Sequence, residues 1–305
     1  MRPRSREPVN RRWSSAPALP WRAFFVLVLA AGCPASRLAA QPGYRPVPDY
    51  AQTGKPDQAE GRRILEEFRG AGIPGEYFLE FQLRALPRRG DERAYAGRLW
   101  ASSRALGAIS RVTLIVDGAE QRLLLQDGAQ PAAWSWGAAA GRGVTMLDVA
   151  ALFLPIAQTD FTPFDLERPY LYWTDFVFEG LTRVSGRPAY RFLLYPPADF
   201  LAKYPTLTGV RLYLDTQFKQ PVQIEQIGAG GRPLKSVTVQ ELKKIGDQWI
   251  PKTVDLRNDV TRDKTRFQVT GAALRQVLPP EIFAPGALAD DVKSPAPENV
   301  TRIDP

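Results

Sequence analysis

The region between residues 77 and 270 is dominated by short runs in which apolar and polar residues alternate. The clearest run puts Tyr77, Leu79, Phe81, Leu83 and Ala85 on one side of the chain and Glu80, Gln82 and Arg84 on the other. A period of two is typical of a β-strand whose sheet has one apolar and one wet face. The apolar faces of such a sheet must be covered, and the function depends on what covers them.

Twelve segments carry this pattern, and glycine-containing turns such as Asp117-Gly118 and Asp127-Gly128 separate several of them. The predicted strands are Glu76–Leu86, Tyr95–Ser102, Ile109–Val116, Glu120–Gln126, Ala132–Trp136, Phe176–Val184, Tyr190–Tyr195, Gly209–Asp215, Pro221–Gly228, Leu234–Ile245, Trp249–Arg257 and Thr265–Ala273.

Only two helices are predicted. The first covers residues 57–70, where Asp57 and Glu60 form a capping box and glycines end the helix. The second covers residues 145–153 and ends before a Leu-Pro pair, and residues 158–173 are predicted to be irregular. Two short helices are too few to flank a sheet of this size as a separate layer.

The predicted fold is therefore mainly β: an incomplete, half-open antiparallel β-barrel of about 11–12 strands, with short α-helices as a lid or plug. A sheet of this length either closes or curls strongly, and helices placed inside it cover the apolar faces of both. Residues 57–284 form the predicted domain. A Pro/Gly-rich tether over 41–56 precedes it, and a flexible, proline-rich tail over 285–305 follows it.

The first forty residues have the pattern of a secretory signal peptide: a basic lead, the apolar stretch Ala23–Ala31, and small residues ahead of Gln41. The stretch is shorter than the roughly 20 residues that span a bilayer. The alternative is a lipoprotein, because Leu29–Cys33 is close to a processing box in which Cys33 would be acylated. The protein is expected to be periplasmic in the first case and membrane-anchored through Cys33 in the second.

Removing residues 1–40 changes the charge of the chain. The full sequence has 40 basic and 32 acidic side chains, and this segment holds seven of the basic residues and one of the acidic ones. The remaining 33 and 31 give a net charge of +2. The high isoelectric point therefore gives no indication of nucleic-acid binding.

The chain has no histidine, and its single cysteine is Cys33. Cys/His zinc sites, Ser-His-Asp catalysis and thiol nucleophiles are therefore excluded beyond the signal segment. We expect no catalytic residue, no metal site and no cofactor. The carboxylates open to an enzyme hypothesis are Glu80, Glu179 and Asp215, which alternate with apolar residues and are expected on the wet face.

Several segments between Asp57 and Phe283 resemble the LolA/LolB-like family of outer-membrane lipoprotein-sorting proteins. These segments are Thr159–Leu166, Asp175–Gly180, Gly186–Pro197, Arg211–Asp215, Gln220–Val222 and Gln248–Lys252. Asp215, Pro221 and Trp249 are expected to have structural roles: ending a strand, lying at a sheet edge and plugging the sheet. Carriers of this family hold a helical lid closed with an arginine; Arg62, Arg63 and Arg84 are candidates, but none lies in a matching motif.

The resemblance implies a carrier or chaperone that binds the acyl chains of lipoproteins or lipids in an apolar cavity. Partners would include an inner-membrane transporter and an outer-membrane acceptor, and the protein would be a monomer. The candidate lining residues, which could equally form an ordinary core, are Leu79, Phe81, Leu83, Leu99, Val112, Leu114, Phe178 and Leu212. The alternative hypothesis is an envelope-anchored lipid sensor or protein-interaction module with the same fold.

Overall fold

The computed structural model describes residues 44–303, except 52–53, 71, 105–106, 138–142 and 218–219. Residues 39–305 form one compact unit. The predicted signal peptide over residues 1–40 and Cys33 lie outside the described residues.

The strands of the described residues form one antiparallel sheet in the order β6-β5-β4-β3-β2-β1-β13-β12-β11-β10-β9-β8-β7, with β14 paired to β13. The strands are β1 Glu76–Leu86, β2 Arg93–Arg104, β3 Gly107–Val116, β4 Ala119–Gln126, β5 Ala132–Gly137, β6 Thr145–Met146, β7 Phe176–Val184, β8 Arg187–Leu194, β9 Gly209–Asp215, β10 Pro221–Ile227, β11 Pro233–Ile245, β12 Gln248–Asn258, β13 Lys264–Gln276 and β14 Thr301–Arg302. All twelve predicted strands are present, and the two-residue strands β6 and β14 are additional.

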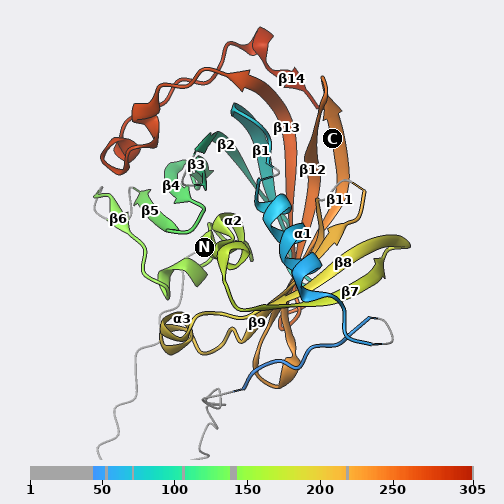
Figure 1. The fold of residues 1–305 in the computed structure, drawn as a ribbon. Helices are drawn as coiled ribbons and strands as arrows, with labels where there is room; N and C mark the ends of the chain where they lie inside the picture. Colours follow the sequence, from blue (N-terminus) through green and yellow to red (C-terminus); the bar gives the residue numbers. More distant parts are fainter. Residues whose placement is uncertain are drawn as a thin grey trace, which may run out of the picture. The chain divides into compact units, whose positions relative to one another are not determined.

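The sheet curls around the helices without closing (Figure 1). Its terminal strands β6 and β7 pair only with β5 and β8, so no ladder joins the two edges within the described chain. The predicted half-open antiparallel barrel is confirmed.

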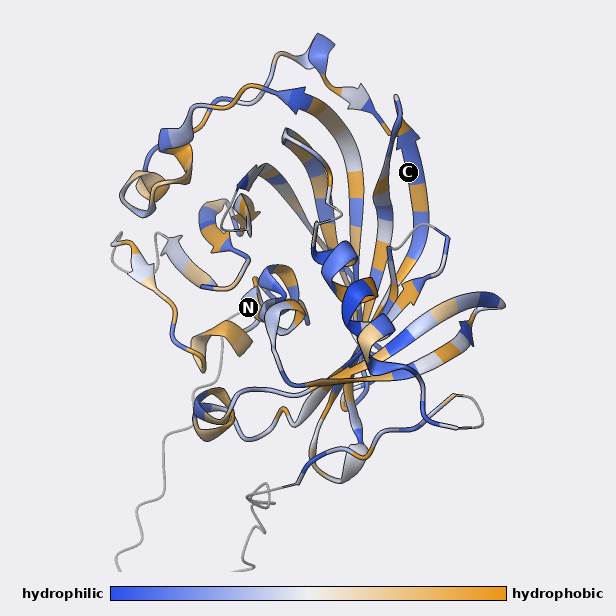
Figure 2. Cartoon of the chain, viewed as in Figure 1, coloured by the Kyte–Doolittle hydropathy of each residue, from blue (hydrophilic) through white to orange (hydrophobic). Residues whose placement is uncertain are grey.

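The helices are α1 Gln58–Gly70, α2 Pro163–Glu167 and α3 Ala198–Lys203, with 3₁₀ helices η2 Ala151–Phe153, η3 Pro169–Tyr172, η4 Ala229–Gly231, η5 Pro280–Phe283, η6 Pro285–Ala289 and η7 Pro297–Asn299. Helix α1 matches the prediction and lies inside the curl, where Ile64, Leu65 and Phe68 are buried (Figures 1 and 2).

Helix α1 lies very close to strand β7. A Cβ atom on Gly61 would lie 2.4 Å from Cβ of Phe178, so only glycine permits this approach. The Gln58 side chain continues the edge of β7, because its amide donates to the Phe178 carbonyl at 2.9 Å and accepts from the Phe178 N–H at 2.8 Å. One end of α1 is therefore fixed to the sheet.

The predicted helix over residues 145–153 is wrong. Thr145 and Met146 pair with Ser135 and Trp134 as strand β6, and only Ala151–Phe153 is helical. The carboxylate of Asp148 accepts from the N–H of Ala151 and caps that later turn. Sheet pairing therefore overrides a weak capping signal.

Residues 158–173 are more regular than predicted, because they contain α2 and η3. Thr162 and Asp165 form a reciprocal capping box, and Pro163 occupies the first helical position. Arg168 then adopts the left-handed conformation, with φ 55°, and ends the helix. The short helix α3 was also not predicted.

Part of the outer face of the sheet, over β3, β4 and β5, is covered by residues 279–303, which we call the C-terminal strap (Figure 1). Phe283, Leu288 and Val300 pack with Phe78 and Trp100 in a cluster separate from the main core. The segment predicted as a loose tail therefore buries apolar side chains against the barrel.

Two buried arginines bind the main chain of this strap. Arg111, only 1% exposed, donates to the carbonyls of Ile282, Ala287 and Leu288 at 3.1, 2.8 and 3.2 Å and also to that of Asp290. Arg122 is 5% exposed and donates to the carbonyls of residues 288–290.

Residues 44–51, which we call the N-terminal strap, are bound to β7 and β8. Arg45 donates to the Asp175 carboxylate at 2.6 and 2.9 Å, and its guanidinium lies 3.5 Å from the ring centroid of Tyr195. The N–H groups of Asp49 and Ala51 donate to the side chain and carbonyl of Glu179. This part of the predicted tether is therefore held on the sheet.

Two structural roles expected from the sequence need correction. Trp249 does not plug the sheet, since its side chain is 46% exposed. Pro221 lies in β10, which is an interior strand, but it is the first residue of that strand, and pairing with β11 begins only at Gln223. Its missing N–H is tolerated for that reason. Asp215 ends β9, as predicted.

Candidate functional site

The inner face of the curled sheet is the candidate site. Buried or partly buried apolar side chains from β1 to β5 and from β7 to β13 belong to one continuous cluster. Besides α1 and α3, the main cover is residues 147–173, which we call the central segment and which contains η2, α2 and η3. Figure 2 shows orange apolar positions on the strands around these helices.

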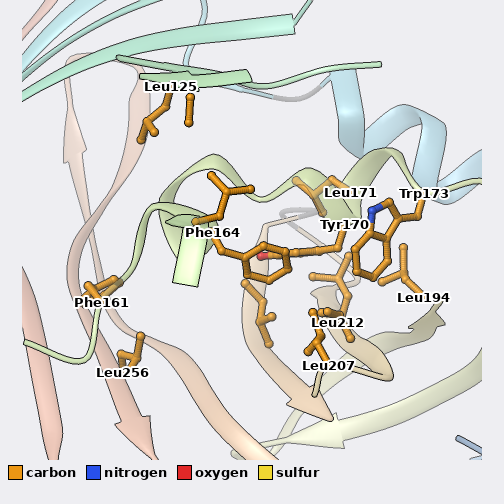
Figure 3. Close-up of a cluster of buried hydrophobic side chains, with 14 of the residues drawn as sticks. Leu125, Phe161, Phe164, Tyr170, Leu171, Trp173, Leu194, Leu207, Leu212 and Leu256 are labelled. Carbon is orange, nitrogen blue, oxygen red and sulfur yellow. The ribbon is translucent and has the colours of Figure 1, made fainter. Parts of the chain in front are cut away.

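The central segment covers the sheet mainly with aromatic rings. Phe164 and Tyr170 are 0% and 2% exposed, and they lie beside Trp173 and the sheet residues Leu194 and Leu212 (Figure 3). The ring centroids of Phe164 and Tyr170 lie 5.6 Å apart, and those of Phe164 and Trp173 lie 6.4 Å apart. These rings therefore occupy the space that a half-open barrel would otherwise offer to a ligand.

The aromatic cluster continues onto α3. Phe153 stacks on Phe164 at 4.6 Å and on Tyr204, just after α3, at 3.6 Å between ring centroids. Phe200 of α3 lies 5.4 Å from Trp173. The central segment and α3 therefore form one aromatic layer over the inner face.

The structure places seven of the eight predicted cavity residues in this interior. Phe81, Leu83, Val112, Leu114, Phe178 and Leu212 are buried members of the main cluster, and Leu99 is partly buried against it. Leu79 belongs to a neighbouring cluster with Ile250 and Ile303. Their role as a cavity lining stays a prediction.

The middle of the central segment is held by two aspartates. The Asp160 carboxylate accepts from Asn258 at 2.8 Å, and its backbone carbonyl accepts from Lys235 at 2.7 Å. The Asp165 carboxylate, 1% exposed, accepts from Lys235 at 3.1 Å and from Gln226. The acidic, aromatic stretch Thr159–Leu166 therefore has two kinds of contact. Its aspartates bind side chains of β10, β11 and β12, and its aromatic rings pack in the interior.

The C-terminal end of the segment is held by Arg69 of α1, which the sequence analysis missed. Its guanidinium donates to the carbonyl of Leu171 at 2.5 Å and to that of Trp173 at 3.2 Å. It also lies 5.5 Å from the ring centroid of Tyr172. Burial lowers the pKa of Arg69 from its ordinary value. Arg69 therefore joins the two parts of the cover.

The arginines considered from the sequence make different contacts. Arg62 lies 5.4 Å from the ring of Phe176, outside the central segment. Arg63 pairs with Glu67 within α1, and Arg84 pairs with Glu92 at 3.1 Å on the surface. The sequence offered no signal for Arg69 beyond a basic residue in the last turn of a helix, which is common for other reasons.

A polar cluster lies at the edge of this apolar interior. It contains Asp127, which follows β4, and Glu167 and Arg168, where α2 ends. A guanidinium nitrogen of Arg168 lies 3.5 Å from the Asp127 carboxylate. Glu167 is 2% exposed, and its Oε2 has no hydrogen-bond partner. Burial, with a smaller contribution from Asp127, raises the pKa of Glu167 to about 8.

The three carboxylates of the enzyme hypothesis bind different partners. Glu80 pairs with Arg302, and Asp215 accepts from the N–H of Gln217. Glu179 is fully buried rather than on a wet face, and it binds the side chains of Arg191 and Arg211 at 3.0 and 2.9 Å. The wet-face expectation for Glu179 is therefore wrong, because the N-terminal strap and two arginines cover it.

Two clefts lie among the described residues, and the larger one borders the interior, because Tyr95 of the main cluster and Gln158 of the central segment line it. One of about 520 Å³ is lined by the β7–β8 and β9–β10 turns, β11 and Trp249, and one of about 700 Å³ lies beside Arg93 and Asp117. No predicted cavity residue lines either cleft. Within the described part of the chain, no helix is both long and apolar enough to cross a membrane.

Comparisons with known proteins show what the chain is similar to. A family model described as "Uncharacterized protein" matches residues 130–290, which is more than half of the chain. No curated protein matches the sequence.

Solved structures share the fold at low sequence identity. A domain assigned to outer membrane lipoprotein-sorting proteins from Vibrio parahaemolyticus is 16% identical, with a TM-score of 0.64 over 76% of this chain and 100% of that one. A DUF1329 family protein from Desulfovibrio piger is 13% identical, with a TM-score of 0.65 over 77% and 100%. A LolA superfamily protein from Nitrosomonas europaea is 15% identical, with a TM-score of 0.57 over 73% and 96%. These similarities show a LolA-like fold.

Proposed function

This chain belongs to the family whose model matches residues 130–290 and has a LolA-like fold, and from that premise we propose that it is a non-enzymatic carrier of acyl chains. It would act in the periplasm, with lipoproteins or lipids as cargo. The observation that supports this most is the cover of the inner face: a continuous apolar surface shielded largely by one short helix and by the central segment.

The covering elements have the features of a lid. The central segment is bound by polar side chains at its middle, through Asp160 and Asp165, and at its C-terminal end, through Arg69. Between these points most contacts are apolar and non-directional, as in the packing of Phe164 against Tyr170, apart from the Arg168–Asp127 ion pair. Releasing these few polar contacts would therefore free the part of the aromatic layer that the central segment carries.

Acyl chains could replace that layer at little net cost. Each buried methylene contributes about 0.8 kcal/mol, so two chains of ordinary length offset the burial of several aromatic side chains. The cargo would occupy the surface formed by residues such as Leu114, Leu212 and Leu256. The same apolar face would then be covered by protein in the empty state and by lipid in the loaded state.

Uptake of a fluorescent fatty acid by the purified protein, expressed as the full chain, tests this function. Wild type should bind the probe with slow, saturable kinetics, because the lid must open first. Arg69→Ala should accelerate uptake several-fold, since it removes the hydrogen bonds to Leu171 and Trp173. Arg63→Ala is the matched control, because Arg63 lies on the same helix and pairs with Glu67 of that helix.

Native mass spectrometry on protein isolated from its own envelope gives the second measurement. A bound lipid or lipopeptide would support the carrier. Protein that is free of lipid and also takes up no probe, even as Arg69→Ala, would overturn the proposal.

A further inference from the structure

Glu167 is a buried polar group for which the folded protein supplies no partner. Its side chain lies at the end of α2, which packs against β4, and its Oε2 makes no hydrogen bond. Leaving such a group unpaired costs about 1–3 kcal/mol.

The neighbouring Arg168 is also incompletely paired. Its Nε is buried without an acceptor, while another nitrogen of the same guanidinium lies 3.5 Å from Asp127. Arg168 has the left-handed conformation, which is uncommon for residues other than glycine, asparagine and aspartate. An unused acceptor and an unused donor therefore lie on adjacent residues of the central segment.

The cluster extends from the interior to the surface. The Glu167 residue is 2% exposed, the Asp127 side chain 12% and the Arg168 side chain 39%. A lipid whose acyl chains enter the apolar interior would place its polar head at such a boundary. The cluster is thus located where a head group, rather than a chain, would contact the protein.

The charges of the cluster select among head groups. Asp127 and Arg168 form an ion pair, and the raised pKa leaves Glu167 largely neutral at pH 7, so the net charge is close to zero. An anionic head would meet the Asp127 carboxylate, and a head without charge would leave the Arg168 Nε–H and the Glu167 oxygen unpaired. A zwitterion supplies both missing partners: an anionic oxygen for Arg168 and an ammonium for the two acids.

We propose that Asp127, Glu167 and Arg168 bind the polar head of the cargo and select a diacyl lipid whose head carries a phosphate and a primary ammonium. This inference rests on the proposed carrier function and adds the class of cargo. Arg168 would donate to the phosphate, and the carboxyl groups of Asp127 and Glu167 would accept from the ammonium.

Titration of delipidated protein with three dipalmitoyl lipids, followed by native mass spectrometry, tests the selection. The lipids are phosphatidylethanolamine, phosphatidylglycerol and diacylglycerol, which share their acyl chains and differ in the head. Wild type should bind the first about tenfold more tightly than the other two. The double variant Asp127→Asn/Glu167→Gln should bind all three within about twofold of one another.

Glu298→Gln is the control, because Glu298 is an exposed carboxylate in η7, and it should keep the wild-type preference. If the double variant does not fold, Glu167→Gln alone should still lower the preference several-fold. Equal binding of the three lipids by wild type, or an unchanged preference in the variants, would overturn the head-group assignment alone. Failure of all three lipids to bind would overturn the carrier function itself.

Discussion

Replacing Glu167 by glutamine should change how the stability of the protein depends on pH. Burial raises the pKa of Glu167 from 4.5 to about 8, because the charged form would lose its hydration without gaining a partner. In the unfolded chain the carboxyl group ionises near its ordinary pKa. Between these two values the folded protein holds a proton that the unfolded protein has lost.

The sign follows from proton linkage. A carboxyl whose pKa is raised by folding contributes its full stability below pH 4.5, and that contribution is lost as the pH rises toward 8. At 1.36 kcal/mol per pH unit, Glu167 should cost about 3 kcal/mol of unfolding free energy at pH 7 relative to pH 4. At pH 8 the cost should reach about 4 kcal/mol. Glu167→Gln removes the titrating carboxyl group, and with it the part of the unfolding free energy that depends on pH through Glu167.

Urea unfolding followed by tryptophan fluorescence measures the effect, since Trp173 lies in the aromatic layer and is 6% exposed. The difference in unfolding free energy, variant minus wild type, should grow in favour of Glu167→Gln from pH 5 to pH 8. Other titrating groups, including Asp127, whose pKa burial also raises, remain in both proteins and largely cancel. Stability curves of wild type and variant that run parallel across this range would refute the assignment of a neutral, buried Glu167.

Two further substitutions test the packing that supports the site. Gly61→Ala should lower the unfolding free energy by about 1–3 kcal/mol, because the new methyl group would lie 2.4 Å from Phe178 and push α1 away from β7. Thermal melting should show this loss of stability. Gly72→Ala is the control and should melt like wild type, because the space around Gly72 is open. Arg111→Met should lower the unfolding free energy by about 2–4 kcal/mol, because it leaves carbonyl groups of the C-terminal strap unpaired. Trypsin should then cleave the strap at the exposed Lys293 faster than in wild type. An unchanged cleavage rate would contradict the role of Arg111.

Much of the sheet could be predicted because period-two alternation depends only on local sequence. Strands β1, β7 and β9 have the predicted bounds, residue for residue. The short strand β6 carries too few residues for a pattern, and its pairing with β5 depends on a contact across the intervening loop. Prediction failed there because the helical signal was local and the pairing was not.

The sequence contains a sign that the outer face is covered, which the period-two pattern alone does not reveal. Phe78 lies between Tyr77 and Leu79, on the side of β1 that was expected to be wet, and Leu123, Leu124 and Leu125 follow one another in β4. Strands that are apolar on both sides indicate that both faces are buried. The C-terminal strap was the missing cover, but its attachment through Arg111 could not be foreseen, because a strand arginine ordinarily reaches solvent.

The candidate site was predictable only in part, for a physical reason. An apolar inner face has the same sequence pattern whether it lines a cavity or packs against the chain itself. Residues such as Phe81 and Leu212 could therefore be placed on the inner face, but the sequence did not show whether they bind a ligand or form an ordinary core. The contacts that distinguish the two cases are single polar groups. Arg69 and Glu167 are such groups, and their positions depend on the three-dimensional fold, so no sequence pattern identifies them.

The two faces of the sheet differ in how their covers are attached. On the outer face, Arg111 and Arg122 hold the C-terminal strap through many bonds to its main chain, and Glu179 holds the N-terminal strap. The inner cover has polar attachments at Asp160, Asp165 and Arg69, and the unpaired oxygen of Glu167 lies between the last two. Opening it in water would expose apolar surface at about 25 cal/mol per Å², so opening without cargo is disfavoured. Ionisation of Glu167 in the open state offsets part of that cost, and binding of lipid offsets the rest. The lid should therefore open mainly where acyl chains are available to bind.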